Sequence, residues 1–366
     1  MRAKLEDVCD RGSSNLRQSD VEGKNGDYPI YGASGYIGNV DFYHQELPYV
    51  AVVKDGAGVG RTMLLPAKSS VIGTMQYLLP KKNVLPAYLY YVVRYMHLEK
   101  YFSGATIPHI YFRDYKNEEF NLQSIDRQTE IVDALSKVES IISARQQQLQ
   151  KLDELVKARF VEMFGDSEFN TMQWPTKKLS ELCAVSSSKR IYQNEQSTEG
   201  VPFLRISDLN ERIDNVKNAP ELFIPINKYN ELKENGLVPT EGDILVTSRG
   251  TLGRCYIVRP EDEFYFQDGM ISWLSDLNSQ ITSVYLSQLF AMSGIQKQIA
   301  SLQAGSTVAY LSITMLKKLN IMLPPLDRQE QFAAFVEQTD KSKAAVQKSL
   351  DEAQLLFDSL MQKYFG

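Results

Sequence analysis

A stretch of the chain that occurs twice limits what this sequence can fold into. Residues 126–165 and 327–366 align without a gap, and each copy begins with Asp-Arg-Gln and ends with Phe-Gly. A match of this kind between two distant segments indicates internal duplication. The sequence therefore predicts a fold in which one structural unit is built twice.

Each copy carries an apolar stripe with the spacing of a long helix. Apolar residues recur at alternating steps of four and three, and Gln, Glu, Lys and Asp fill most other positions. Such a seam specifies a helix that must bury its stripe against another helix. About 35 helical residues would span roughly 50 Å. The residues predicted to form the helix-pairing seam are Ile131, Leu135, Val138, Ile142, Leu149, Leu152, Val156, Phe332, Val336, Val346, Leu350 and Phe357.

The natural partner of each helix is its own duplicate. The same steps also place Arg159 in the first seam, and Leu360 and Tyr364 in the second. A lone heptad pattern is equally typical of a helix through which two chains dimerise. Because each copy here ends its own half of the chain, we expect the two helices to pair and to separate two domains.

The repeat divides the chain into four parts. We expect a globular domain at residues 1–125, a long helix at 126–165, a second domain at 166–325 beginning with a polar linker at 166–173, and a long helix at 326–366. Most of the extra length of the second domain lies between Ala184 and Val246, where we expect a loop insertion. The predicted fold class is α+β, with two similar mixed α/β domains and two long coiled-coil helices.

Short strands and turns dominate the first domain. Aromatic and aliphatic residues alternate with Gly and Ser at 28–38, and β-rich runs follow at 49–53 and 62–66. Residues 86–101 predict a helix with proline in its first turn, and residues 120–122 predict a final strand.

The glycines of residues 54–61, Lys-Asp-Gly-Ala-Gly-Val-Gly-Arg, invite comparison with a nucleotide-binding loop. Such a loop has a different glycine spacing and opens a helix, whereas here a short apolar run ending in proline follows. We therefore expect a strand, a turn and a strand, in which Lys54 and Arg61 bring two cations near a phosphate. Residues 242–254 repeat this pattern, so that Gly253 and Arg254 match Gly60 and Arg61.

Composition narrows the class of protein. The net charge of −5 gives no basic signature, so positive charge for a nucleic acid would have to be local or come from partners. We expect no membrane segment and a cytoplasmic location. Cys9 and Cys183 occupy matching places and predict two equivalent buried thiols, and with three histidines we expect no metal site.

Several of these segments together resemble a known family. Residues 28–35 read Tyr-Pro-Ile-Tyr-Gly-Ala-Ser-Gly, residues 305–307 read Gly-Ser-Thr, and residues 323–331 read Leu-Pro-Pro-Leu-Asp-Arg-Gln-Glu-Gln before the long helix. This duplicated arrangement resembles the DNA specificity subunit of Type I restriction-modification systems over essentially the whole chain. The first copy departs from the pattern because residues 123–130 lack the two prolines.

The resemblance implies a non-catalytic subunit. Each globular domain would be a target recognition domain that reads half of a bipartite site in double-stranded DNA. The two helices would run antiparallel, set the unread spacer and dock two methyltransferase subunits. Restriction and translocase subunits would join through the complex, and S-adenosylmethionine, ATP and Mg²⁺ would be bound by those partners, leaving this chain without a cofactor.

The recognition domains of the family vary too much for DNA-contact residues to be assigned from a shared motif. The contact residues are therefore predicted from the chemistry of their side chains. Arginine suits guanine, lysine and arginine suit phosphate, and all are also common as solvated surface charges. The residues predicted to bind DNA are Lys54, Arg61, Thr106, His109, Lys189, Arg190, Arg205, Arg249 and Arg254.

Three other kinds of protein are weighed against the sequence. A self-contained DNA amino-methyltransferase needs a tetrapeptide such as Asn-Pro-Pro-Tyr, and the double proline at 324–325 lacks its polar and aromatic neighbours. A specificity subunit of a related Type II system remains an alternative, as does a protein-binding helical scaffold without DNA affinity.

Overall fold

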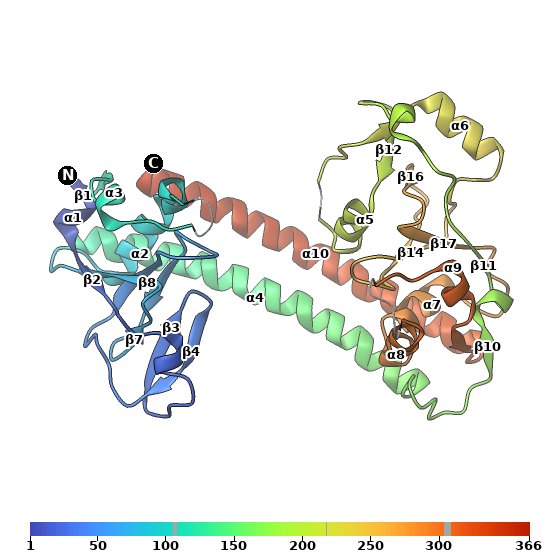
Figure 1. The fold of residues 1–366 in the computed structure, drawn as a ribbon, viewed down its shortest axis with the longest axis horizontal. Helices are drawn as coiled ribbons and strands as arrows, with labels where there is room; N and C mark the ends of the chain where they lie inside the picture. Colours follow the sequence, from blue (N-terminus) through green and yellow to red (C-terminus); the bar gives the residue numbers. More distant parts are fainter. Residues whose placement is uncertain (105–107, 217, 304–308) are drawn as a thin grey trace. The chain divides into compact units, whose positions relative to one another are not determined.

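The computed structural model describes residues 1–104, 108–216, 218–303 and 309–366. The chain divides into a first unit, Met1–Gln147 with Gln347–Gly366, and a second unit, Gln148–Val346. Two 40-residue helices, α4 (Ile125–Phe164) and α10 (Leu326–Phe365), each contribute residues to both units (Figure 1). The two predicted long helices are therefore confirmed.

The first unit contains three small sheets. In the largest, the strand order is β2-β8-β5-β6 and every pair is antiparallel. A second sheet has the order β4-β3-β7, in which β3 and β7 are parallel, and β1 pairs with β9. The strands are β1 (Arg2–Lys4), β2 (Cys9–Ser13), β3 (Tyr28–Gly32), β4 (Gly35–Val40), β5 (Tyr49–Val53), β6 (Thr62–Leu65), β7 (Ser70–Val71), β8 (Met75–Pro80) and β9 (Glu119–Asn121).

The second unit repeats this topology strand for strand. Its sheets have the orders β11-β17-β14-β15, β13-β12-β16 and β10-β18, and β12 is again parallel to β16. The strands are β10 (Thr176–Lys178), β11 (Ala184–Ser186), β12 (Val201–Leu204), β13 (Phe223–Ile224), β14 (Ile244–Thr247), β15 (Cys255–Ile257), β16 (Tyr265–Phe266), β17 (Ile271–Ser275) and β18 (Asn320–Met322). The duplication seen in the long helices thus extends through both globular parts.

The shorter helices reveal where the units differ. Matching helices are α2 (Pro86–Tyr95) and α7 (Ser283–Phe290), and α3 (Phe112–Tyr115) and α9 (Ile313–Lys317). The insertion expected between Ala184 and Val246 is present, but it is not only a loop. Its extra residues include two helices, α5 (Ile206–Ile213) and α6 (Ile226–Glu234). The remaining helical segments are α1 (Leu5–Val8), α8 (Ser293–Leu302) and the 3-10 turns Gln18–Asp20, Leu98–Tyr101, Leu179–Glu181 and Gln193–Glu195.

Two predicted elements have different bounds in the structure. The helix expected at 86–101 ends at Tyr95, because His97 adopts the left-handed conformation with φ of 50° and a 3-10 turn follows. The final strand expected at 120–122 is β9, which begins and ends one residue earlier. The linker at 166–173 consists of turns and irregular backbone.

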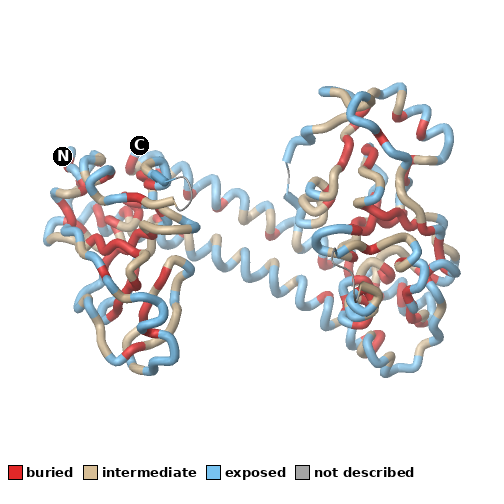
Figure 2. Tube along the Cα trace, in the orientation of Figure 1, coloured by how far each residue is buried: buried red, intermediate tan, exposed pale blue. Residues whose placement is uncertain are grey.

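The cores of the two units are built from equivalent parts. In each, apolar residues of the largest sheet pack with the helix that follows it and with the ends of α4 and α10. The buried residues gather inside each unit in Figure 2. Cys9 and Cys183 are buried in these cores and donate to the carbonyl oxygens of Leu5 and Leu179 at 3.2 and 3.6 Å. Burial raises the pKa of both thiols to about 12, as expected for inert core cysteines.

The long helices pack antiparallel within each unit. In the first unit the N-terminal part of α4 shares a core with the C-terminal part of α10, and Arg145 Nε donates to Ser349 Oγ at 3.2 Å. In the second unit Phe160 and Phe164 pack against Phe332, with ring centroids 5.5 and 5.4 Å apart. The apolar ends of both helices are therefore fastened to a globular core.

The seam keeps the predicted heptad positions over most of both helices and shifts by one position in the last turns. Of the predicted seam residues, Ile142, Leu149, Leu152 and Leu350 are half-buried, and the others, including Val346 at the middle of α10, are buried. In the last turns of the helices, Phe160, Met361 and Phe365 are buried one position after the predicted Arg159, Leu360 and Tyr364, while Met163, which lies on the heptad steps, is buried as well. A helix with 3.6 residues per turn drifts out of a 3.5-residue repeat, which explains the displacement.

A buried glutamine explains the repeated Asp-Arg-Gln sequence. The amide of Gln329 accepts from Thr282 N–H at 2.9 Å and donates to the carbonyl oxygens of Gln280 and Pro324, both at 2.9 Å. Gln128 makes the same three bonds in the first unit, to Leu85 N–H and the carbonyl oxygens of Asn83 and Gln123. Each glutamine thus fastens the start of a long helix to the residue that caps α2 or α7.

Replacing this glutamine tests its structural role. In Gln329→Met the shape is kept, but the N–H of Thr282 and two carbonyl oxygens lose their partner in a buried site. At about 1 kcal/mol for each lost bond, we expect a loss of roughly 3 kcal/mol in the free energy of unfolding, measured by urea denaturation. Gln331→Met, at an exposed position of the same helix, is the control, and equal losses would contradict the assignment.

The displaced seam gives a second prediction. Phe160 is fully buried among Phe164, Tyr285 and Phe332, so Phe160→Ala should cost about 3–5 kcal/mol. The neighbouring Arg159 forms an exposed ion pair with Glu162, and its replacement by Ala should cost under about 1 kcal/mol. Thermal and urea unfolding of the two variants would measure the difference. A larger loss of stability for Arg159→Ala would show that position 159, as the heptad predicts, and not position 160 lies in the seam.

Candidate nucleic-acid interface

The glycine-rich turn of the first unit joins β5 to β6. Gly60 N–H donates to Val53 O, and Val53 N–H donates to Arg61 O, both at 2.9 Å. Gly56, Gly58 and Gly60 all have φ near +87°, a conformation that side chains strongly disfavour. The predicted strand-turn-strand is confirmed, because β5 and β6 are antiparallel neighbours.

The second unit builds the same turn between β14 and β15. Gly253 N–H donates to Thr247 O, and Thr247 N–H donates to Arg254 O, again both at 2.9 Å. This turn is shorter by one residue, and Gly250 and Gly253 have positive φ of 69° and 75°. The predicted match of Gly60 and Arg61 with Gly253 and Arg254 therefore holds for the backbone.

A second segment crosses each turn in the same way. Ile110 N–H donates to Lys54 O at 2.9 Å, and Leu311 N–H donates to Ser248 O at 3.0 Å. The preceding residues form isolated antiparallel bridges, His109 with Asp55 and Tyr310 with Arg249. We define the first turn site as residues 54–61 with 108–111, and the second turn site as residues 248–254 with 309–312.

The first turn site brings three of the predicted contact residues together. Lys54 lies 3.8 Å from the carboxylate of Asp55, Arg61 donates to Ala33 O at 3.0 Å, and the ring of His109 packs edge-on against Tyr111 at 4.9 Å. Thr106 lies outside the described residues. The turn and the segment that crosses it thus carry a lysine, an arginine and a histidine, side chains suited to contact with a phosphate or a base edge.

Sequence reasoning missed Tyr111 and Arg113 beside this site. The guanidinium of Arg113 lies over the ring of Tyr111, 4.7 Å from its centroid, and Tyr111 contacts His109. The signal that could have found them is the recurrence of a histidine, a tyrosine and an arginine at every second position, 109, 111 and 113, across the start of α3.

In the second turn site the predicted arginines have different surroundings. Arg254 donates to Asn210 Oδ1 at 2.8 Å and to both carboxylate oxygens of Asp214, so it fastens α5 to β15. Arg249 is exposed, and its guanidinium lies over the ring of Tyr310, 5.4 Å from its centroid. Arg254 is thus built into the fold, whereas Arg249 presents its donors to solvent.

The other predicted cations of the second unit lie on other elements. Arg190 pairs with Asp268 at 3.0 Å, and Arg205 pairs with Asp208 and Glu221 at the start of α5. Hydrogen bonds to Asp208 and then Glu221 raise the pKa of Arg205 above its usual value. Lys189 is exposed, and its backbone N–H donates to the hydroxyl of Tyr265 at 2.8 Å. These residues remain predictions as DNA contacts.

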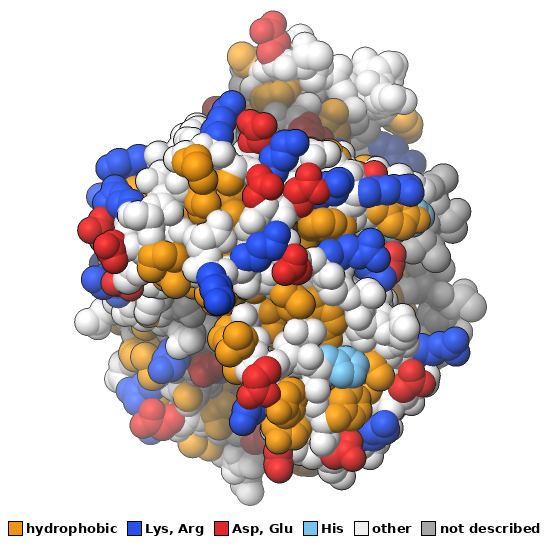
Figure 3. Space-filling model, turned by 90° about the vertical axis from the view of Figure 1, so that its left-hand side faces the viewer, with side chains coloured by type: hydrophobic (Ala, Val, Ile, Leu, Met, Phe, Trp, Pro, Cys, Tyr) orange, Lys and Arg blue, Asp and Glu red, His pale blue; other side chains and the backbone are white. Residues whose placement is uncertain are grey.

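Charge is mixed on the face of the first unit shown in Figure 3. Lysine and arginine side chains alternate there with aspartate and glutamate, and apolar side chains lie between them. With a net charge of −5 for the chain, this face does not generate the single-sign field of a strongly basic DNA-binding domain.

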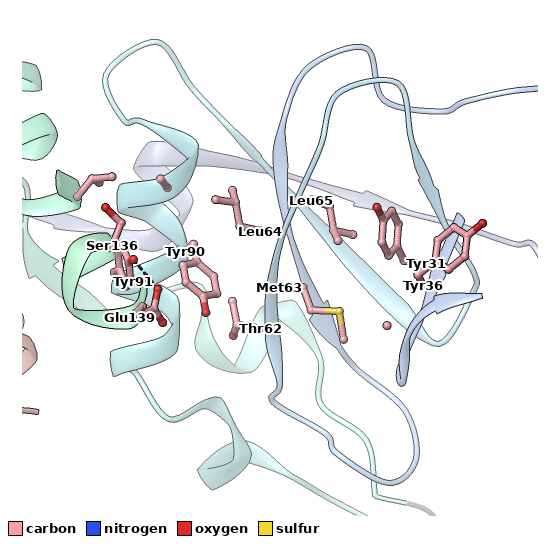
Figure 4. A pocket seen from close by; sticks show the side chains of 13 residues that line it. Tyr31, Tyr36, Thr62, Met63, Leu64, Leu65, Tyr90, Tyr91, Ser136 and Glu139 are labelled. Atoms are coloured by element: carbon pink, nitrogen blue, oxygen red, sulfur yellow. Dashed lines mark hydrogen bonds between the residues drawn. The ribbon is translucent and has the colours of Figure 1, made fainter. Parts of the chain in front are cut away.

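An open groove of about 540 Å³ lies in the first unit between the β3-β4 hairpin, β6, α2 and α4. Figure 4 shows Tyr31, Met63 and Tyr90 along it. Its carboxylate, Glu139, accepts a bond from Tyr91 at 2.6 Å and pairs with Arg94. The acidic group is thus engaged in structural bonds, and the groove is an apolar, tyrosine-rich surface.

Within the described ranges, no group of three or more His, Cys, Asp or Glu residues has the arrangement needed to hold a metal ion. Likewise, among the helices that the structure describes, none combines the length and apolarity needed to cross a membrane.

The geometry defines the class of protein. Two units with the same strand topology carry the same turn site, and both fasten the ends of two paired 40-residue helices. This is the architecture of a duplicated specificity subunit. Residues 1–154 and 172–354 match the family described as Type I restriction modification DNA specificity domain, and the chain belongs to that family.

Individual relatives agree with this assignment. A type I restriction enzyme specificity subunit of Haemophilus influenzae is 23% identical over 323 residues, which cover 86% of this chain and 80% of the relative. The MjaVIII specificity subunit of Methanocaldococcus jannaschii is 24% identical over 317 residues, 80% of this chain and 72% of the relative. A crystal structure of the S subunit from M. genitalium matches with a TM-score of 0.62 and 16% identity, covering 100% of this chain and 96% of that one.

The comparisons confirm three expectations from the sequence. The resemblance to Type I specificity subunits, the fold class and the assignment as a subunit that is not itself an enzyme are all shown by the family and its relatives.

Replacing Arg254 and Arg249 by Ala separates structural from exposed arginines. Arg254→Ala removes bonds to Asn210 and Asp214 and should lower the stability of the second unit by about 1–3 kcal/mol. Arg249→Ala removes an exposed stack and should change it by under about 1 kcal/mol. Thermal unfolding measures both, and an unchanged melting temperature for Arg254→Ala would contradict the structural role of that residue.

Proposed function

We propose that this chain gives a Type I restriction-modification complex its sequence specificity by binding double-stranded DNA at two half-sites, one for each target recognition domain. The observation that carries the proposal is that one backbone framework, the turn site, is built twice with different exposed side chains. A scaffold that repeats while its surface varies suits the reading of two unlike half-sequences. In this scheme residues 1–125 and 166–325 are the two reading domains, and 126–165 and 326–366 are the spacer helices.

The spacer helices fix the number of unread base pairs between the half-sites. Half-sites on one face of the duplex lie about one helical turn apart, roughly 34 Å. Two antiparallel helices of 40 residues each have the reach to set such a distance. This role is supported by the burial of both ends of each helix in a globular core.

Catalysis and much of the electrostatic attraction then belong to partner subunits. We propose that two methyltransferase subunits dock on the helices, that restriction and translocase subunits join through them, and that these partners bind S-adenosylmethionine, ATP and Mg²⁺. The net charge of −5 supports this division, because DNA affinity rises with the number of phosphates that cations neutralise. The complex would act in the cytoplasm.

The direct test compares the DNA methylation of the host with and without this gene. We expect one split motif, consisting of two short half-sites and a fixed spacer, to lose its methylation when the gene is deleted. Restoring the gene should restore the motif. An unchanged methylome in a host that carries the methyltransferase genes would exclude the proposal, and loss of an unsplit motif would exclude the two-domain division.

Shortening the helices tests the spacer role. Removing residues 144–150 together with 344–350 takes one heptad from each helix around the bond between Arg145 and Ser349. The helices shorten by roughly 10 Å, the length of about three base pairs, so methylation should move to a shorter spacer with both half-sites unchanged.

The matched control removes the heptad from one helix only. This deletion puts the two seams out of register, so we expect loss of assembly rather than a new spacer. Altered half-site sequences in the double deletion would contradict the assignment of spacing to the helices.

A further inference from the structure

The two turn sites place different side chains at the same point of one framework. The residue before Asp55 and the residue before Arg249 are each bonded through the backbone N–H and C=O to the same two neighbouring segments. Asp55 then bridges to His109, as Arg249 bridges to Tyr310. Positions 55 and 249 are therefore equivalent, although one carries an acceptor and the other a donor.

Both positions are open to a ligand. Arg249 is exposed, and the side chain of Asp55 is 41% exposed. The next residue is glycine in each case, with φ of 87° at Gly56 and 69° at Gly250. Within the described part of the chain, no atom lies within 4 Å of the place where a Cβ of either glycine would stand. A large ligand could thus approach the backbone closely at both sites.

Arg249 has the chemistry of a guanine reader. Its guanidinium is held over the ring of Tyr310, a contact that restricts the plane of the donors without neutralising their charge. Several other arginines of the second unit are paired with carboxylates, including Arg190 with Asp268 and Arg212 with Asp262. A planar pair of N–H donors matches the O6 and N7 acceptors of guanine in the major groove.

Asp55 has the opposite requirement. An ionised carboxylate only accepts hydrogen bonds, so it is repelled by the acceptors of guanine and suits a base with an exocyclic amino group, cytosine or adenine. Lys54 lies 3.8 Å away, and this single, partly exposed contact leaves lone pairs of the carboxylate available. The same framework position therefore favours different bases in the two units.

We propose that positions 55 and 249 are matched base-reading positions, with Arg249 selecting guanine in one half-site and Asp55 selecting an amino-bearing base, cytosine or adenine, in the other. The inference rests on the proposed function, since it presumes that each unit reads one half of a split site. It attributes a difference in base preference between the two half-sites to a single equivalent position, which carries Asp55 in the first unit and Arg249 in the second.

The experiment uses the full chain assembled with its methyltransferase subunits and a library of duplexes in which one base pair of the wild-type site is varied at a time. Arg249→Gln and Arg249→Ala should abolish the preference for guanine at one position of one half-site, with affinity for the wild-type site reduced about tenfold or more. Asp55→Ala should relax one position of the other half-site, and the base preferred there identifies cytosine or adenine as its target.

A matched control is an arginine with the same kind of stacking contact outside the turn site. Arg259 is also an exposed arginine stacked on a tyrosine, 5.7 Å from the ring of Tyr256, but it lies outside the turn site. Arg259→Ala should leave every base preference unchanged. Thermal unfolding of each variant shows whether it is folded, and the more conservative Arg249→Gln and Asp55→Asn replace any variant that is not.

The possible outcomes separate this inference from the proposed function. Folded Arg249 and Asp55 variants that keep all base preferences, or lose preference equally in both half-sites, overturn the base-reading assignment while the split site of the wild type still stands. A wild-type complex with no sequence preference overturns the proposed function itself. Loss confined to one position of one half-site for each variant supports the assignment.

Discussion

The structure depends on the burial of the ends of α4 and α10 in the cores of the two units. A helix with one apolar stripe is not stable alone in water, and most of its stability comes from packing. Here Phe160, Phe164 and Phe332 are fully buried beside Tyr285 of α7, and equivalent residues do the same in the first unit. Gln128 and Gln329 add directed bonds that join the start of each helix to its domain.

This fastening leaves the turn sites free to vary. Their shape is set by backbone hydrogen bonds and by glycines with positive φ, none of which specifies the side chain at position 55 or 249. An aspartate in one unit and an arginine in the other therefore occupy the same framework without altering it. The residues that hold the fold are thus separate from the side chains at positions 55 and 249, and the proposed difference between the half-sites requires no change in the framework.

The sequence predicted the parts of the fold that have a local or periodic signal. The long helices follow from their apolar repeat, and the strand-turn-strand follows from glycine spacing. The stack of Tyr111 and Arg113 was missed because it depends on how a segment crosses the turn. The roles of Arg205 and Arg254 were equally hidden, since Asp208, Glu221 and Asp214 reach them only through α5 and its flanking segments, an insertion that the repeat cannot predict.

Internal ion pairs also determine how many cations are free to contribute to DNA binding. Arg190, Arg205 and Arg254 are each engaged by carboxylates, so binding a phosphate through them would first break an internal contact. Nonspecific attraction to DNA grows with the number of cations free to displace counterions, and this chain commits many of its cations to its own fold. In the proposed DNA-binding role, directional contacts by a few exposed side chains would then contribute a larger share of the discrimination between sequences. Under the proposed function, this distribution of charge favours a subunit that selects the site, with most of the affinity for DNA supplied by partner subunits.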